Sequence, residues 1–377
     1  MKTLGEIFEI GSGGTPSKSH PEYYDGNIPW VKTGDLKDEY LYSVEDCISE
    51  EGLNNSSAKM YPSGTVLIAM YGATIGATSI LKFDACTNQA CAAFKPCEEV
   101  LPEYLYFFLR SKKQKFISDG VGGAQPNISA RYLKNVSIDI RNIKEQEKIV
   151  TVLDKLNGII QKRQKEIDEL DELIKARFVE LFGDININDK GWDIEPLGNL
   201  CTIVRGGSPR PIEQFLGGDV PWIKIGDATD GDNIYLNSTK EHIIQEGVKK
   251  SRLVKAGSLI FANCGVSLGF ARIITFDGCI HDGWLAMEDI DERLDKVFLL
   301  QALNQMTEHF RAIAPAGTQP NLNTAIMKAY RQVLPPLELQ KEFIAFAKQV
   351  DKSKVVVQKS LEETQKIFDS LMQEYFG

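Results

Sequence analysis

Apolar residues recur at helical spacing over two long stretches of the chain, residues 143–182 and 337–376. They alternate in steps of four and three residues, which is the heptad spacing of a coiled-coil seam. Neither stretch contains proline, and Gly158 is their only glycine. We therefore predict two long helices, each about 60 Å in length at ~1.5 Å per residue. The alternative is a pair of amphipathic helices that pack only on their own domains.

The predicted seam has the same phase in both stretches. In the first it runs through Ile149, Leu153, Leu156, Ile160, Arg163, Ile167, Leu170, Ile174, Arg177 and Leu181. In the second it runs through Phe343, Ala347, Val350, Lys354, Val357, Leu361, Thr364, Phe368, Leu371 and Tyr375.

The segments that precede the two helices carry a different pattern. Short β-rich runs, such as residues 65–69 and 258–262, are separated by turns rich in glycine, proline, asparagine and aspartate. A helical stretch follows the strands in each segment, near residues 102–116 and 294–310. The pattern predicts an α+β domain before each long helix. The expected division is 1–142 (first domain), 143–183 (central long helix), 184–196 (linker), 197–336 (second domain) and 337–377 (C-terminal long helix).

The two halves of the chain are copies of one unit. The run IPWVKTGD at residues 28–35 recurs as VPWIKIGD at 220–227, and GGTP at 13–16 recurs as GGSP at 206–209. The offset between matching positions stays between 192 and 194 residues along the chain. So many matches in one register indicate a duplicated domain-plus-helix module. Such a chain can fold with pseudo-two-fold symmetry and present equivalent surfaces to two copies of one partner.

Length, cysteine content and charge narrow the class of protein. A chain of 377 residues exceeds what one compact core usually holds, which agrees with two domains. The chain start has no apolar signal-peptide core, no run is apolar enough to span a bilayer, and the seven cysteines show no Cys-x-x-Cys spacing. We therefore expect a cytoplasmic protein with free thiols. The net charge of −9 argues against a nucleic-acid binder that acts alone.

The sequence contains no recognisable catalytic motif. Residues 11–19 resemble a phosphate-binding loop, but Ser17 stands where that motif needs the glycine before its lysine. The four histidines are scattered, and none recurs in the other copy. Asp35 and Asp227 recur beside glycines, where turn capping is the default role. We expect neither enzymatic activity nor a cofactor or metal site.

The order and duplication of the motifs resemble the specificity subunits of type I restriction-modification systems. The motifs that carry the resemblance are LGE at 4–6, GGTP at 13–16, IPWVKTGD at 28–35, QPN at 125–127, EQ at 145–146 and PPLELQ at 335–340. The resemblance covers essentially the whole chain. One departure is IRNIK at residues 140–144, where the family usually has a double proline before the helix.

The resemblance implies an α+β fold with two homologous target-recognition domains. Two long helices would separate the domains and form an antiparallel coiled coil with pseudo-two-fold symmetry. Each domain would read one half of a bipartite, asymmetric site on double-stranded DNA. Such a non-catalytic subunit binds two methyltransferase subunits and, through them, two restriction and translocase subunits.

Residues that differ between the copies are the better candidates for reading bases, because two half-sites normally differ. The loops at 70–74 and 263–267 differ, as do the pairs at 88–89 and 281–282. An amide can bond adenine in a bidentate manner, and a carboxylate can accept from cytosine. Turn formation is the alternative role for each of these positions. The candidates are Tyr71, Thr74, Asn88, Gln89, Asn263, Ser267, His281 and Asp282.

Shared residues are expected to hold phosphates or to build the scaffold. Lys32, with Thr33 beside it, and Lys224 occupy the shared PWxKxGD loop, where phosphate contact and a solvated lysine are the two alternatives. Lys18 and Arg210 follow the GG[TS]P turn, and either could hold phosphate or read guanine.

Two further shared pairs are assigned structural roles. Trp30 and Trp222 each lie between proline and an apolar residue, which favours core packing over base stacking. Gln125 and Gln319 are expected to fix the turn into the last strand of each domain.

Two other functions remain open from the sequence. A duplicated, non-enzymatic adaptor or carbohydrate-binding protein would suit the acidic composition, although the chain lacks an aromatic platform. An autonomous endonuclease or methyltransferase would need catalytic motifs that the sequence does not contain. A gel shift with the cognate methyltransferase and an activity assay on the isolated chain would distinguish these functions.

Overall fold

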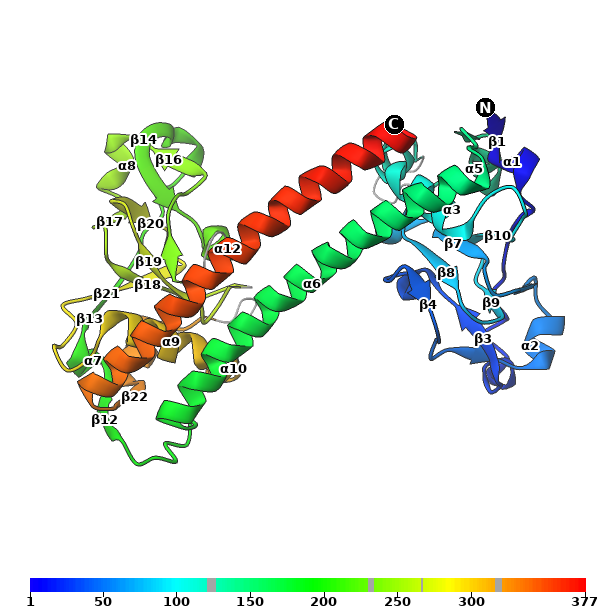
Figure 1. Cartoon of the computed structure of the whole chain (residues 1–377). Helices are drawn as coiled ribbons and strands as arrows, with labels where there is room; N and C mark the ends of the chain where they lie inside the picture. The colour runs from blue at the N-terminus through cyan, green and yellow to red at the C-terminus, as the bar shows by residue number, and fades with distance from the viewer. Residues whose placement is uncertain (121–126, 230–233, 266, 316–320) are drawn as a thin grey trace. The chain divides into compact units, whose positions relative to one another are not determined.

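The computed structural model describes residues 1–120, 127–229, 234–265, 267–315 and 321–377. The chain forms two compact units. The first consists of Met1–Lys165 with Gln358–Gly377, and the second of Glu166–Val357. Each unit therefore contains one α+β domain together with part of each long helix (Figure 1).

The long helices have the predicted extent. Helices α6 (Ile143–Phe182) and α12 (Leu337–Phe376) each contain 40 residues. Every predicted seam position is buried or half-buried, and most positions beside the seam are exposed. In the first unit the start of α6 shares a hydrophobic core with the end of α12, and in the second unit the end of α6 shares a core with the start of α12. The helices therefore pair antiparallel, as the resemblance implies.

The α+β domain of the first unit contains two main sheets. Their strand orders are β2-β10-β7-β8-β4 and β5-β3-β9-β6, and a small third sheet pairs β1 with β11. Helix α3 packs on β7 and β8. The strands are β1 (Lys2–Thr3), β2 (Ile10–Ser12), β3 (Ile28–Val31), β4 (Tyr40–Leu41), β5 (Cys47–Ile48), β6 (Met60–Tyr61), β7 (Val66–Ala69), β8 (Thr78–Leu81), β9 (Ala85–Thr87), β10 (Cys91–Phe94) and β11 (Ser137–Ile138). The helices are α1 (Leu4–Ile7), α2 (Glu50–Asn54), α3 (Pro102–Ser111), α4 (Lys113–Asp119) and α5 (Ala130–Lys134).

The domain of the second unit repeats this topology. Its sheets have the orders β13-β21-β18-β19-β15, β16-β14-β20-β17 and β12-β22, and α9 packs on β19. The strands are β12 (Asp193–Pro196), β13 (Thr202–Arg205), β14 (Leu216–Ile223), β15 (Tyr235–Leu236), β16 (Glu241–Ile243), β17 (Arg252–Val254), β18 (Leu259–Ala262), β19 (Ala271–Ile274), β20 (Gly278–Ile280), β21 (Trp284–Glu288) and β22 (Arg331–Leu334). The helices are α7 (Leu197–Leu200), α8 (Gln245–Val248), α9 (Lys296–Gln305), α10 (Thr307–Ile313) and α11 (Thr324–Ala329).

A buried glutamine fixes the start of each long helix on its domain. The Gln146 side chain accepts a hydrogen bond from the Leu101 backbone at 2.9 Å and donates to the carbonyls of Glu99 and Arg141 at 2.8 Å. Its counterpart Gln340 makes the same three kinds of bond to the backbone in the second unit. The departure from the family at residues 140–144 therefore leaves the helix start unchanged, because α6 begins at Ile143 just as α12 begins at Leu337.

A pair of carboxyl groups lies where α6 meets the first domain. Glu39 and Asp154 line a cavity of about 420 Å³ with Asn157, whose amide donates to Glu39 Oε2 at 3.1 Å. Burial, and then the charge of Asp154, raises the pKa of Glu39. Burial, and then the charge of Glu103, raises the pKa of Asp154. Folding therefore favours the protonated forms of this pair.

We expect Glu39→Gln to stabilise the first unit at neutral pH. Both pKa values lie above their ordinary values of 4.5 and 3.8, so the free energy of unfolding falls as the pH rises from the ordinary to the raised values. Glutamine cannot ionise and can still accept from Asn157. The melting midpoint near neutral pH should rise by roughly 2–4 °C. Calorimetry from acidic to neutral pH tests this against the exposed control Glu45→Gln, and equal shifts in the two variants would contradict it.

Candidate nucleic-acid interface

The shared PWxKxGD segment forms the same capped turn in both domains. Asp35 Oδ2 accepts the backbone N–H of Lys32 at 2.7 Å, and Asp227 Oδ2 accepts that of Lys224 at 2.8 Å. The turn-capping role predicted for these aspartates is therefore confirmed. Trp30 and Trp222 are buried, which confirms the prediction that they pack in the core.

The two shared lysines are held in equivalent positions. Lys32 Nζ lies 2.5 Å from Asp46 Oδ2, and Lys224 Nζ lies 2.6 Å from Glu241 Oε1. Each ammonium group also lies over the preceding indole, 5.2 and 5.8 Å from the ring centroid. Each lysine therefore has a local acidic partner, and a phosphate would have to compete with that carboxylate. Thr33, half-buried in the turn that follows, comes between Lys32 and Asp35.

Asn88 and His281 have the same turn-forming role although they are different residue types. Asn88 Oδ1 accepts the backbone N–H of Ala90 at 3.1 Å, and His281 Nδ1 accepts that of Gly283 at 3.0 Å. Burial lowers the pKa of His281, although the neighbouring Asp282 opposes this shift. The neutral imidazole therefore keeps Nδ1 as an acceptor. Of the two roles predicted for these positions, base reading and turn formation, the structure supports turn formation.

Gln89 and Asp282, the next residues, are each tied to the hydroxyl of the GG[TS]P turn. Thr15 Oγ1 donates to Gln89 Oε1, and Ser208 Oγ donates to Asp282 Oδ1 at 2.7 Å. Gln89 is exposed and Asp282 is half-buried. One scaffold therefore presents an amide in the first domain and a carboxylate in the second.

The loops at 70–74 and 263–267 differ in accessibility. Tyr71 is exposed and forms a β-bridge with Asn127, while Thr74 is half-buried and donates to the Tyr71 carbonyl at 3.2 Å. In contrast, Asn263 is 0% exposed and Ser267 is 2% exposed. These two side chains have no surface for a base, so burial argues against their predicted role in base contact.

The amide of the buried Asn263 donates to Asn321 Oδ1 at 3.3 Å. This contact joins the loop to the asparagine that ends the second QPN motif. Val266, Gln125 and Gln319 lie outside the described residues, so the predicted turn role of the two glutamines stays a prediction.

Two arginines near the turn that holds Asp282 were not among the candidates predicted from the sequence. Arg205 Nε donates to the Asp282 carbonyl at 2.9 Å, and Arg252 Nε donates to the Arg205 carbonyl at 3.0 Å. Arg210, 74% exposed, places its guanidinium 3.8 Å from Asp282 Oδ2. The second domain therefore gathers three arginines around this turn, whereas the first domain has the exposed Lys18 near its equivalent. Basic residues immediately beside the GGSP run could have indicated this cluster.

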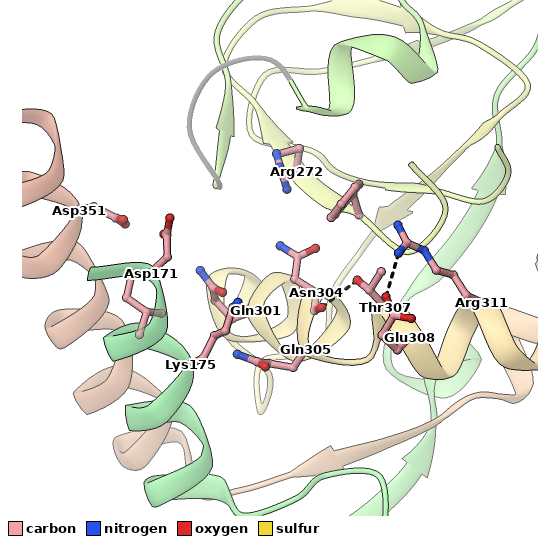
Figure 2. A pocket seen from close by; sticks show the side chains of 12 residues that line it. Asp171, Lys175, Arg272, Gln301, Asn304, Gln305, Thr307, Glu308, Arg311 and Asp351 are labelled. Carbon is pink, nitrogen blue, oxygen red and sulfur yellow. Dashed lines mark hydrogen bonds and ion pairs between the residues drawn. The ribbon is translucent and has the colours of Figure 1, made fainter. Parts of the chain in front are cut away.

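A polar cavity of about 470 Å³ lies in the second unit between the long helices and helices α9 and α10 (Figure 2). Acidic and basic side chains line it in equal number, and Glu308 pairs with Arg311 at 2.8 Å. Its described lining contains no histidine, cysteine or serine and none of the predicted DNA-binding residues. The cavity therefore shares no residue with the candidate interface.

The described residues contain no group of three or more histidine, cysteine, aspartate or glutamate side chains placed to hold a metal ion. None of their helices combines the length and apolar character needed to cross a membrane. All seven cysteines are free thiols, as predicted.

The chain contains two copies of one domain, and each copy is docked on the long helices. Each copy presents a variable turn on a constant scaffold. This arrangement defines a class of sequence-specificity proteins. The family described as type I restriction modification DNA specificity domain matches residues 1–171 and again residues 189–365. The chain therefore belongs to this family. It is a non-catalytic DNA specificity subunit.

Individual relatives agree with this assignment. The chain is 27% identical to the type I restriction enzyme MjaIX specificity subunit of Methanocaldococcus jannaschii, over 99% of this chain and 91% of that protein. It is 33% identical to the EcoR124I/EcoR124II specificity subunit of Escherichia coli, over 44% of each chain.

Two solved structures share the fold. One comes from work on complex assembly and conformational transition of a type I restriction-modification system, with TM-score 0.63, 17% identity and coverage of 99% and 96% of the two chains. The other is a type I S subunit from M. genitalium, with TM-score 0.58, 16% identity and coverage of 100% and 95%.

Proposed function

We propose that this specificity subunit reads a bipartite, asymmetric site on double-stranded DNA, one half with each α+β domain. The observation that carries the proposal is the pair Gln89 and Asp282. Both are held by the hydroxyl of an equivalent turn, yet they offer different chemistry to a base. A turn with the same backbone contacts but a different side chain in each domain suits two domains that read different half-sites. Lys18, Lys32, Arg210 and Lys224 are the proposed phosphate contacts, with Tyr71 and Thr74 beside the reading turn of the first domain.

The acidic composition is consistent with a reader that works inside a larger complex. The net charge of −9 disfavours tight binding by the chain alone, because phosphate neutralisation supplies much of the affinity for DNA. The proposed partners are two methyltransferase subunits, which would contribute further phosphate contacts. We further propose that two restriction and translocase subunits join through them, since the relatives are named as subunits of type I restriction enzymes.

The proposed docking sites for the methyltransferase subunits lie on the long helices. Leu173 of α6 and Ile367 of α12 occupy equivalent positions of the duplication and are 46% and 53% exposed. Leu173 lines a shallow groove of the second unit with Ala176 and Phe346. Exposed apolar side chains at duplicated positions favour two copies of one covering partner.

Mapping of methylated adenines in a host that carries the whole system tests the reading function. The expected result is a bipartite asymmetric motif with a spacer of fixed length. A continuous palindrome would contradict it.

The stoichiometry is tested separately by native mass spectrometry. Leu173→Asp and Ile367→Asp should each reduce the complex from two methyltransferase subunits to one, because a buried unpaired charge opposes docking at one site only. Val356→Asp is the matched control, since this exposed residue has the polar counterpart Lys162 in α6. A strict one-to-one complex for the unaltered chain would refute two-fold docking.

A further inference from the structure

We propose that Asp282 selects a base with an exocyclic amino group, cytosine or adenine, at one position of the half-site that the second domain reads. This inference rests on the proposed function and adds the chemical requirement that one side chain imposes on the DNA. It follows from how the carboxylate is held, which groups surround it and which hydrogen-bonding capacity it has left.

The turn fixes Asp282 in place before any DNA arrives. Ser208 Oγ donates to Oδ1 at 2.7 Å and accepts the backbone N–H of Asp282 at 3.3 Å. Arg205 Nε holds the carbonyl of the same residue at 2.9 Å. The other carboxylate oxygen, Oδ2, lies 3.8 Å from the exposed guanidinium of Arg210, which is beyond hydrogen-bond distance. One oxygen is therefore anchored while the other keeps its capacity to accept.

The surroundings keep this group ionised. Burial alone would raise the pKa of Asp282, but the hydrogen bond from the Ser208 hydroxyl and the nearby guanidinium charges of Arg210 and Arg205 lower it overall. An ionised carboxylate accepts hydrogen bonds and donates none. In the major groove, cytosine N4 and adenine N6 are donors, whereas thymine O4 and the guanine O6 and N7 atoms are acceptors. Asp282 therefore favours an amino base and disfavours thymine and guanine.

The arginines near Asp282 support its proposed contact with a base. Arg205 and Arg252 bond to backbone carbonyls through Nε, so each is oriented by the turn itself. Cations around the carboxylate would offset its repulsion of the DNA backbone. The first domain has Gln89 at the equivalent position, and an amide can both donate and accept. The strict requirement for an amino base is therefore confined to the second domain.

A double-mutant cycle on the complete complex with its methyltransferase subunits tests the proposal. The probes are duplexes that carry the mapped site, in which each cytosine or adenine of the second half-site is replaced in turn by 2-pyrimidinone or purine, which lack the amino group. For the unaltered protein, one replacement should weaken binding by roughly tenfold to a hundredfold. In Asp282→Asn the same replacement should change binding by less than about threefold. The base at that position identifies the selected base as cytosine or adenine.

The asparagine variant is nearly isosteric and can still accept from Ser208, and its melting curve checks its fold. Gln89→Glu is the matched variant of the first domain, and the penalty in the second half-site should stay as large in it as in the unaltered protein. If every amino-group penalty is the same in Asp282→Asn, Asp282 is not the selector, and the proposed function still stands. If the unaltered complex prefers no DNA sequence, the proposed function fails and this inference fails with it.

Discussion

A chimaera in which residues 1–142 come from another family member should methylate a site with a new first half and an unchanged second half. The junction lies immediately before α6, and Gln146 attaches the helix to the domain through backbone atoms of Leu101, Glu99 and Arg141. Backbone contacts do not depend on the side chains of the incoming domain. The helix should therefore accept a foreign domain that keeps the same chain path and the apolar side chains that share a core with the helix ends.

The expected change is complete for one half-site, because the whole reading surface of the first domain is exchanged. Sequencing of methylated adenines in hosts that express the chimaera with its methyltransferase provides the measurement. Exchange of residues 197–336 is the reciprocal control, since Gln340 attaches α12 in the same way. A chimaera that changes both halves of the site together would show that the two domains do not read independently.

The long helices could be predicted because their seam depends on local periodicity alone. A heptad pattern specifies which side is buried whatever the partner, and every seam position is indeed buried or half-buried. The division into compact units could not be predicted in this way. The sequence suggests boundaries at 142 and 183, whereas each compact unit combines a domain with parts of both helices. That grouping depends on contacts between residues about two hundred positions apart.

The candidate site was only partly predictable, since comparison of the copies identifies variable positions and not their accessibility. Asn88 and His281 have no chemical likeness, yet both accept a backbone N–H two residues ahead. Asn263 follows a strand in a polar, glycine-rich loop, which suggested exposure. It is buried instead, and Asn321, far along the chain, supplies a partner for its amide. Such tertiary contacts decide between the base-reading and structural roles.

Replacement of Phe178 by alanine should destabilise the second unit by roughly 3–5 kcal/mol, the usual cost of deleting a buried phenyl ring. Phe178 is 1% exposed. Its ring centroid lies 4.8 Å from that of Phe182, 5.8 Å from that of Phe298 and 5.3 Å from that of Phe343. These rings come from α6, α9 and α12, so one side chain joins both long helices to the second domain. Its loss would leave a cavity at their junction.

Hydrogen exchange is the suitable measurement, because a chain with two units need not unfold in one step. Amide protection in α9 and in the last turns of α6 should fall by more than a hundredfold in Phe178→Ala. Protection in α3, which packs on the other helix ends in the first unit, should change far less. Val179→Ala is the matched control, because this neighbouring side chain is exposed and its loss should cost less than about 0.5 kcal/mol. Equal loss of protection in the two variants would show that the phenylalanine cluster does not hold the helices on the domain.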